Sequence, residues 1–293
     1  MSLVINHNLM AMNASRNLQD SYSSLGVSTR RLSSGLRVGT AADDAAGLAI
    51  RELMRADVKS LNQGIRNAND AISMIQTADG ALGVIDEKLI RMKELATQAA
   101  TGTYNSDQRL IIDSEYQAMA SEITRIANAT DFNGIHLLNG NMSGANSAHS
   151  GAGLTSTGPV KVHFGTGNDS AEDYYYVSIN TSTASALGVG IAAGNSISTQ
   201  ALAQQSLDKL NNAIISKDKI RANLGALQNR LENTITNLSI QAENVQAAES
   251  RISDVDVATE MTEFTRNQIL TQSAVAMLSQ ANSMPRMAMQ LIG

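Results

Sequence analysis

The sequence predicts a mainly helical protein made of long antiparallel rods of the coiled-coil type, with a β-hairpin and a small strand-containing insert. Apolar residues recur at steps of three and four over two long stretches, as in helices that bury one face. Aromatic residues make up only 3% of the 293 residues and tryptophan is absent, which favours thin seams between helices over a thick core. The two prolines lie outside the main helical runs or near an end.

The first rod spans residues 58–99 without a proline. Its seam residues have coiled-coil spacing: Val58, Leu61, Ile65, Ala68, Ile72, Ile75, Ala78, Leu82, Ile85, Leu89, Met92, Ala96 and Ala99. Two successive steps of three meet at Ala78, and such a change locally overwinds a supercoil. One helix therefore covers the stretch, and its apolar seam needs partners.

A sparser heptad occupies residues 3–36, before the rod. It includes three leucines seven residues apart: Leu18, Leu25 and Leu32. This seam is too narrow for a stable helix alone, because isolated helices are marginal in water. Glycine and small residues at 33–47 predict a bend, and Asp43 and Asp44 are candidate caps of the next helix.

After the first rod, residues 101–107 predict a turn and a helix that reverses direction. Its apolar face contains Ile112, Tyr116, Met119, Ile123 and Ile126. Asn-Gly turn signals at 131–140, around Asn133 and Gly134, predict a β-hairpin. Residues 141–195 are rich in Gly, Ser, Asn and Thr, with strand-like alternation at 160–164 and 175–179, so they predict a small insert.

Helix resumes near Thr199, and the second rod has a seam as long as the first. Its members are Ile220, Leu224, Leu227, Leu231, Thr234, Leu238, Gln241, Val245, Ala248, Ile252 and Val255. The C-terminal segment repeats the thin N-terminal pattern with Leu270, Ala274, Met277, Ala281, Met284, Ala288 and Leu291. The chain thus has a mirrored order, and the predicted segments are 1–42, 43–141, 142–195, 196–255 and 256–293.

Composition excludes several classes of protein. The net charge of −5 provides no basic field for nucleic acid. No run of about 18 apolar residues is present, so no membrane insertion is expected. The N-terminus has neither a charged leader nor an apolar core, which argues against a general secretory signal. The absence of cysteine excludes a disulfide framework and thiol chemistry.

Catalytic and metal-binding constellations are also missing from the sequence. The four histidines are scattered, and neither His-Glu-x-x-His spacing nor a phosphate-binding loop occurs. Asp43 and Asp44 are adjacent, so on a helix they point about 100° apart, and no third ligand is close in sequence. Capping or connecting roles are therefore favoured, and the sequence predicts no enzyme, no metal and no cofactor.

Several motifs occur in a specific order along the two ends of the chain. They include Val4-Ile5-Asn6, Arg31-Leu32-Ser33-Ser34-Gly35-Leu36-Arg37, Asp43-Asp44-Ala45-Ala46-Gly47, Arg66-Asn67-Ala68-Asn69-Asp70, Thr77-Ala78-Asp79-Gly80-Ala81-Leu82, Leu224-Gly225-Ala226-Leu227-Gln228-Asn229-Arg230-Leu231-Glu232 and Leu278-Ser279-Gln280-Ala281-Asn282. Through these motifs, in this order, the sequence resembles bacterial flagellin over roughly the first 140 and last 100 residues. The insert has no such match.

The resemblance implies a subunit that polymerises into the extracellular flagellar filament for swimming. The terminal helices would pair in the inner tube of the assembled filament, with the rods in the next shell and the insert outward. The residues expected to drive self-assembly are Leu18, Leu25, Leu32, Leu270, Met277 and Leu291. Export would use the flagellar type III apparatus without a cleaved signal peptide.

The resemblance also implies partners. A flagellin export chaperone would cover residues 258–293, and cap and junction proteins would contact the polymer. Recognition by Toll-like receptor 5 would involve Arg91, Leu95 and Glu115, although Ile90 stands where glutamine is common. Without the resemblance, Arg91 and Glu115 would be solvated charges or a weak ion pair. We also hypothesise that Arg91 and Leu95 lie at a lateral contact between subunits.

The hairpin at Asn133 and Gly134 is a candidate for the packing change by which filaments of this family switch helical form. Two other structural roles stay open. A hook–filament junction protein would share the terminal seams, and a helical signalling protein would share the long heptads. The rod motifs favour flagellin over the first, and the terminal segments and lack of a membrane span disfavour the second. An enzyme is the least favoured class.

Overall fold

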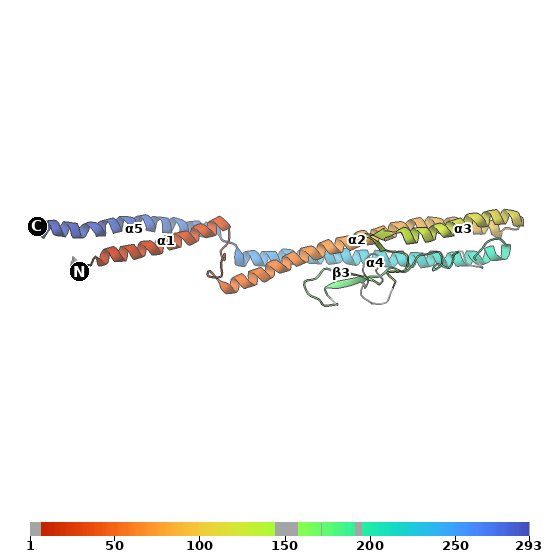
Figure 1. Ribbon diagram of the computed structural model, residues 1–293, viewed down its shortest axis with the longest axis horizontal. Coiled ribbons are helices and arrows are strands. Elements are labelled where there is room, and N and C mark those ends of the chain that lie inside the picture. Colours follow the sequence, from red (N-terminus) through yellow and green to blue (C-terminus); the bar gives the residue numbers. More distant parts are fainter. Residues whose placement is uncertain (1–6, 144–157, 171, 191–194, 293) are drawn as a thin grey trace. The chain divides into compact units, whose positions relative to one another are not determined.

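The computed structural model describes residues 7–143, 158–170, 172–190 and 195–292, with only the backbone described at 285, 286 and 288–292. Its elements are α1 (Leu9–Ser34), α2 (Ala45–Ala100), α3 (Ser106–Ala129), β1 (Asp131–Phe132), β2 (Ile135–His136), β3 (Val160–His163), β4 (Tyr174–Val177), α4 (Gln200–Ser253) and α5 (Val257–Ile292) (Figure 1). The strands form antiparallel pairs, β1 with β2 and β3 with β4. The predicted fold class, helical rods with a small β insert, is confirmed.

The chain divides into two compact units. The terminal unit comprises Met1–Val58 and Glu243–Gly293, and the rod unit comprises Lys59–Ala242. The main apolar core lies wholly within the rod unit, from Leu61 to Ala242. This difference in burial between the units is the basis of the candidate site below.

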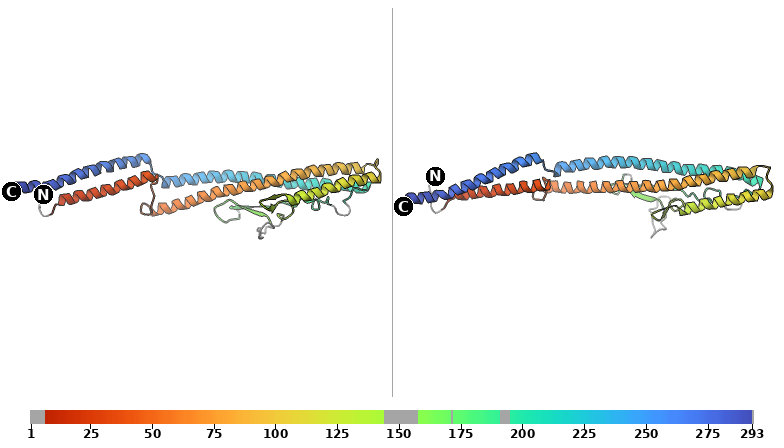
Figure 2. Two further views of the ribbon diagram at one scale, coloured as in Figure 1. Left: turned by 45° about the horizontal axis from the view of Figure 1, so that its top comes forward. Right: turned by 90° about the horizontal axis from the view of Figure 1, so that it is seen from above.

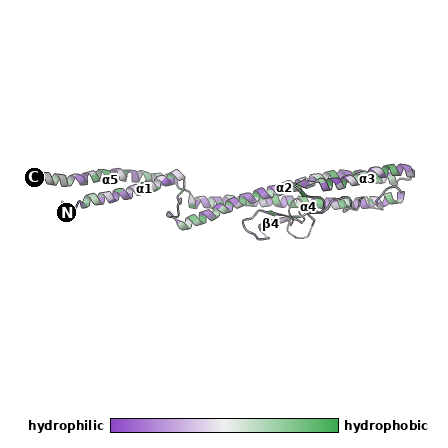
Figure 3. Cartoon of the chain, viewed as in Figure 1, coloured by the Kyte–Doolittle hydropathy of each residue, from purple (hydrophilic) through white to green (hydrophobic). Residues whose placement is uncertain are grey.

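Helices α2, α3 and α4 run alongside one another in the rod unit (Figure 2). The side chains that are almost completely buried include Leu82, Ile85, Leu89 and Met92 of α2, Tyr116 and Ile123 of α3, and Leu210, Leu224 and Leu231 of α4. Hydrophobic and hydrophilic residues alternate along these helices (Figure 3), as expected where each buries one face. Burying a large aliphatic side chain contributes about 1.5–3 kcal/mol, so these seams hold the rod together.

Local signals set where the rod helices begin and turn. Asn105 starts α3 with a capping box: its side chain accepts the N–H of Gln108 at 2.9 Å, and the Gln108 side chain accepts the N–H of Asn105 at 3.1 Å. The β1–β2 hairpin turns at Asn133 and Gly134, which have φ of 51° and 81°. Two positive φ values are the requirement of a type I′ turn, which explains the Asn-Gly signal.

The insert packs directly against α2. The amide of Asn67 donates to the carbonyl of His163 at 2.8 Å, beside the end of β3. At Gly64 the backbone of Phe164 comes so close that a Cβ would overlap its carbonyl oxygen. The alternating residues Val162, Phe164, Val177 and Ile179 are all buried. A glycine on α2 thus makes room for the insert.

The chain is fixed again where it leaves the insert. The carboxylate of Asp113 on α3 accepts the N–H of Ile197 at 2.7 Å and the hydroxyl of Ser196 at 3.1 Å. Lys209 of α4 donates to the side-chain oxygen of Asn195 at 2.7 Å. These bonds hold the approach to α4 against both α3 and α4.

In the terminal unit, α1 and α5 lie side by side (Figures 1 and 2), so the two ends pair within one chain. The segment that follows α1 also pairs with the end of α4 and the segment between α4 and α5. The backbone N–H of Arg37 donates to the carbonyl of Ser253 at 2.7 Å, and the N–H of Val255 donates to the carbonyl of Gly35 at 3.0 Å. Gly35 ends α1 with φ of 72°, a conformation that favours glycine. The side chain of Asp44 accepts the N–H of Gly47 at 2.9 Å, which confirms the predicted cap of α2.

Two aspartates in these connectors predict sensitivity to acid. The Thr40 hydroxyl and N–H, with Arg30, lower the pKa of Asp43, and the Thr259 hydroxyl and N–H, with the N–H of Ala258, lower that of Asp256. A carboxyl with a lowered pKa stabilises the folded state above its ordinary pKa of about 3.9 and loses that effect as pH falls through the folded value. We therefore expect the terminal unit to lose stability between about pH 5 and pH 3.

The check is thermal unfolding of the monomeric chain, followed by circular dichroism from pH 7 to pH 3. The double variant Asp43→Asn/Asp256→Asn keeps a side-chain oxygen that can accept these hydrogen bonds at each position but cannot titrate. Its melting temperature should fall less between pH 5 and pH 3 than that of the unmodified chain. Equal pH slopes in the two proteins would contradict the prediction.

Candidate self-assembly surface

The most deeply buried residues of the helix pair α1 and α5 are small or polar. The residues that it buries include Ser28 on α1 and Glu260, Thr271 and Ala281 on α5. The side-chain amide of Asn8, which also caps α1, donates to the carbonyl of Ala281 at 2.8 Å. Arg31 and Glu260 form an ion pair at 3.5 Å. Larger apolar side chains of the pair, among them Leu18, Leu25 and Leu32 of α1 and Leu278 of α5, are only partly buried.

Large apolar side chains of the same helices are instead exposed. They are Leu9, Met10, Met12 and Tyr22 of α1, and Val257, Met261, Ile269, Leu270, Val275, Met277 and Met287 of α5. Single exposed apolar residues are ordinary, but a dense set on one helix pair marks a surface for interaction. The terminal unit therefore has an inverted pattern: most of its fully buried residues are small or polar, and many of its large apolar side chains are exposed.

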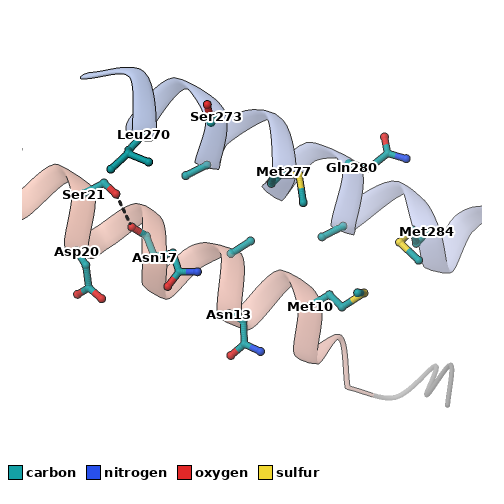
Figure 4. A pocket seen from close by; sticks show the side chains of 13 residues that line it. Met10, Asn13, Asn17, Asp20, Ser21, Leu270, Ser273, Met277, Gln280 and Met284 are labelled. Atoms are coloured by element: carbon teal, nitrogen blue, oxygen red, sulfur yellow. Dashed lines mark hydrogen bonds between the residues drawn. The ribbon is translucent and has the colours of Figure 1, made fainter. Parts of the chain in front are cut away.

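A groove of about 640 Å³ lies between α1 and α5. Met10 of α1 and Leu270, Met277 and Met284 of α5 contribute its apolar lining, and Asn13, Asn17 and Gln280 contribute polar groups. In Figure 4 the side chains of Leu270 and Met277 extend from α5 toward the side on which α1 lies. They nevertheless remain 48% and 64% exposed. The groove is thus apolar, shallow and open to solvent.

The residues predicted to drive assembly fall into three groups. Leu18, Leu25 and Leu32 are half-buried on α1. Leu270 and Met277 are exposed on α5, and Leu291 lies outside the residues whose side chains are described. Among the seam residues of α5 whose side chains are described, Ala274, Ala281 and Met284 are at least partly covered as expected, while Thr271 and Leu278 are covered in place of Leu270 and Met277.

Most seam residues predicted in the middle of the rod lie in or against its core, but Gln241 is exposed and Ala242 is buried in its place. Leu82, Leu89, Leu224, Leu231 and Leu238 are buried, and two further members pack partly buried against them: Ile65 and Ile72. Sequence reasoning missed Lys217, whose side chain is only 2% exposed. Lys217 precedes Ile220 by three residues and so continues the spacing of the α4 seam. A search for apolar residues at that spacing misses it because its side chain is charged.

The residues assigned to receptor contact do not share one surface. Arg91 bonds Glu115 of α3 at 2.8 Å and Glu94 at 3.0 Å, and its bond to Glu115 raises the pKa of Arg91. These side chains are about half exposed, so the pairs contribute little to stability. Leu95 is 2% exposed, so its expected place on the contact surface is corrected: its heptad position puts it in the core, three residues after Met92.

Two other kinds of site are absent from the part of the chain that the structure describes. No described helix is long and apolar enough to cross a membrane. Within the same residues, no group of three or more His, Cys, Asp or Glu side chains is placed to hold a metal ion.

Comparison with known proteins identifies the family. Residues 5–143 match the model of the bacterial flagellin N-terminal helical region, and residues 207–292 match that of the C-terminal helical region. The flagellin FlaB2 of Treponema pallidum is 40% identical over 293 residues, which cover 99% of this chain and 100% of that protein. The chain belongs to the bacterial flagellin family.

A second relative agrees with this assignment, and one solved structure is also similar. A flagellin of Halalkalibacterium halodurans is 41% identical over 290 residues, covering 99% of this chain and 100% of that protein. The crystal structure of Bacillus cereus flagellin is 32% identical and covers 63% of this chain and 94% of its own, with a TM-score of 0.48. The chain is therefore a structural subunit of the flagellar filament, a homopolymer outside the cell that serves motility, and the junction and signalling alternatives gain no support from these matches.

Proposed function

We propose that the filament is built by covering the inverted surface of the terminal unit with neighbouring copies of the chain. The observation that carries this proposal is the exposure of large apolar side chains on α1 and α5, whose most deeply buried residues are small or polar. Burial of this surface between subunits would release apolar area from water, at about 25 cal/mol per Å² before the cost of ordering the ends. Polymerisation would thereby stabilise the terminal helices.

Electron microscopy of the purified full-length protein, beside a version lacking residues 1–36 and 258–293, tests this mechanism. Filaments from the full chain and monomers from the shortened chain are expected. Filaments of equal length from both proteins would mean that the rod unit alone polymerises, and the mechanism would be abandoned.

The layers of the subunit follow from this proposal. Segments 1–42 and 256–293 form the inner tube, 43–141 and 196–255 form the surrounding shell, and the insert at 142–195 faces outward. The role is structural and not enzymatic.

An export chaperone covers residues 258–293 before assembly and hides exposed apolar residues such as Leu270 and Met277. The export apparatus, cap and junction proteins are the other flagellar partners. Measuring the affinity of the candidate chaperone for full-length and shortened chains checks its site.

On the rod, Arg91 and Glu115 are the candidate contacts for Toll-like receptor 5, because both side chains are exposed. Arg91 also belongs to the proposed lateral contact between subunits. Arg91→Ala should reduce both receptor signalling in reporter cells and filament length. An effect on signalling alone would remove Arg91 from the lateral contact.

The hairpin at Asn133 and Gly134 is the proposed element for switching filament waveform. Gly134 has φ of 81°, which a side chain would strain, so Gly134→Val should distort the turn at a cost of about 1–3 kcal/mol. We expect an altered set of filament shapes in dark-field microscopy across pH and salt. An unchanged set of shapes would refute the role.

A further inference from the structure

A lysine occupies a core position of the α4 seam. Counting by threes and fours, the buried residues run Leu210, Ala213, Lys217, Ile220 and Leu224, with exposures of 0%, 1%, 2%, 6% and 1%. Lysine is almost never fully buried unless it is paired. In coiled coils, a single polar residue at such a position lowers stability but specifies how the helices align.

The Lys217 ammonium ties α4 to α2. Its Nζ lies 2.6 Å from Oδ1 of Asp86 on α2 and 2.7 Å from Oδ1 of Asp218 on its own helix. Arg221, one turn further along α4, bonds both carboxylate oxygens of Asp79 on α2, at 2.7 and 3.2 Å. Arg221 follows Lys217 on α4, whereas its partner Asp79 precedes Asp86 on α2. The two ion pairs therefore fit one antiparallel alignment of these helices. The Arg221 pair is partly exposed and therefore weaker.

The apolar seam alone does not distinguish this alignment from its neighbours. On α2, Ile75, Leu82, Leu89 and Ala96 repeat every seven residues, and so do Ala78, Ile85, Met92 and Ala99. A slip of seven residues, about 10 Å along a helix, would again set apolar residues against apolar residues. In the middle of the seam the exchanged side chains, such as Leu82 and Leu89, are similar in volume, and such swaps cost little; only the alanines toward the two ends differ in size.

Charges do distinguish the alignments. A slip of seven residues in one direction would bring Lys217 to the position of Lys93, where two ammonium groups repel. The opposite slip would bring Lys217 to Asp79, but would place Arg221 opposite Ile72 and leave Asp86 without Lys217. The observed alignment is the one in which both basic residues meet aspartates on α2.

We propose that Lys217 is a register-setting residue: its buried ammonium, bonded to Asp86, selects one alignment of α2 with α4 from those that the apolar seam permits. A buried ion pair is weak evidence for stability, and its replacement by apolar residues is often neutral or stabilising. Its value lies in excluding slipped rods. This role does not depend on how subunits assemble.

The test measures register directly in the monomeric full-length chain. The chain has no cysteine, so Asp70→Cys on α2 and Gln205→Cys on α4, both at exposed positions, can carry nitroxide labels for distance measurement by electron paramagnetic resonance. These sites lie far apart along the rod, so a slip of seven residues changes their separation by about 10 Å. The variant is Lys217→Met, and the matched control is Lys219→Met at an exposed position two residues away.

The unmodified chain and Lys219→Met should each give one distance. Lys217→Met should add a second population about 10 Å away, with an unchanged or raised melting temperature of the rod. A single native distance in Lys217→Met would show that the register is set without the Lys217 pair, and would overturn the proposal.

A second variant keeps the test decisive if Lys217→Met fails to fold. The exchange Asp86→Lys/Lys217→Asp reverses the charges across the seam, whereas Lys217→Asp alone places acidic groups together. Restoration of the single native distance by the exchange supports register setting by charge. Two distances, or an unfolded rod, in the exchanged protein would overturn it.

Discussion

The double variant Leu270→Asp/Met277→Asp should form no filaments, while its monomer keeps the helix content of the unmodified chain. Both side chains are largely exposed, at 48% and 64%, so the monomer loses little packing. In the proposed polymer they are covered, and burying an unpaired carboxylate costs several kcal/mol. Because each 1.4 kcal/mol is a factor of ten, about 5 kcal/mol would raise the concentration needed for assembly more than a thousandfold.

Sedimentation of polymer against protein concentration, with circular dichroism of the monomer, measures both expectations. Gln272→Asp is the control, because Gln272 is exposed on α5 but does not line the groove. It introduces a helical aspartate of the same propensity and should leave the assembly threshold near that of the unmodified chain. Normal polymerisation of the double variant would exclude this groove from the contacts between subunits.

Gly64→Ala should destabilise the rod unit by roughly 1–3 kcal/mol, the usual cost of overpacking. On an open helix the same substitution would stabilise by up to about 1 kcal/mol. The sign reverses at Gly64 because a Cβ would overlap the carbonyl oxygen of Phe164, which belongs to backbone and not to a flexible side chain. The insert would have to move away from α2, straining the bond between Asn67 and His163.

Gly80→Ala provides the matched comparison on the same helix. Gly80 is exposed, and a Cβ there would meet no atom within 4 Å. Urea unfolding of the rod unit should therefore shift to lower denaturant for Gly64→Ala and to higher denaturant for Gly80→Ala. Shifts in the same direction would mean that the insert yields to the new methyl group without cost.

Patterns of long period predicted the fold well. The α2 seam could be predicted because its apolar spacing repeats over many helical turns. The Asn-Gly turn and the cap at Asp44 could be predicted because each depends only on a few neighbouring residues. The covered face of α5 was harder to predict, because apolar residues occur on several sides of this helix. Ile269, Leu270 and Met277 compete with Thr271 and Leu278, and only packing against α1 decides which face is covered.

Functional positions departed from the sequence pattern for similar reasons. The resemblance assigned Leu95 to receptor contact, but this residue lies in the core because its heptad position faces the other rod helices. Lys217 was overlooked because a charged residue ordinarily marks a solvated face, and only the bond from α4 to Asp86 on α2 explains its burial. A contact between residues 131 positions apart cannot be derived from local periodicity.

The hydrogen bonds that Asp113 accepts from Ser196 and Ile197 are useful for protein engineering. Because these hydrogen bonds lie after the insert, a foreign peptide that replaces residues 142–195 would leave the chain before α4 bonded to α3. Such a graft is limited by what the insert covers: its buried residues Val162, Phe164, Val177 and Ile179 would leave the core, and Gly64 of α2 would become exposed. A guest sequence that displays an antigen should therefore also supply a flat, extended strand to lie across Gly64.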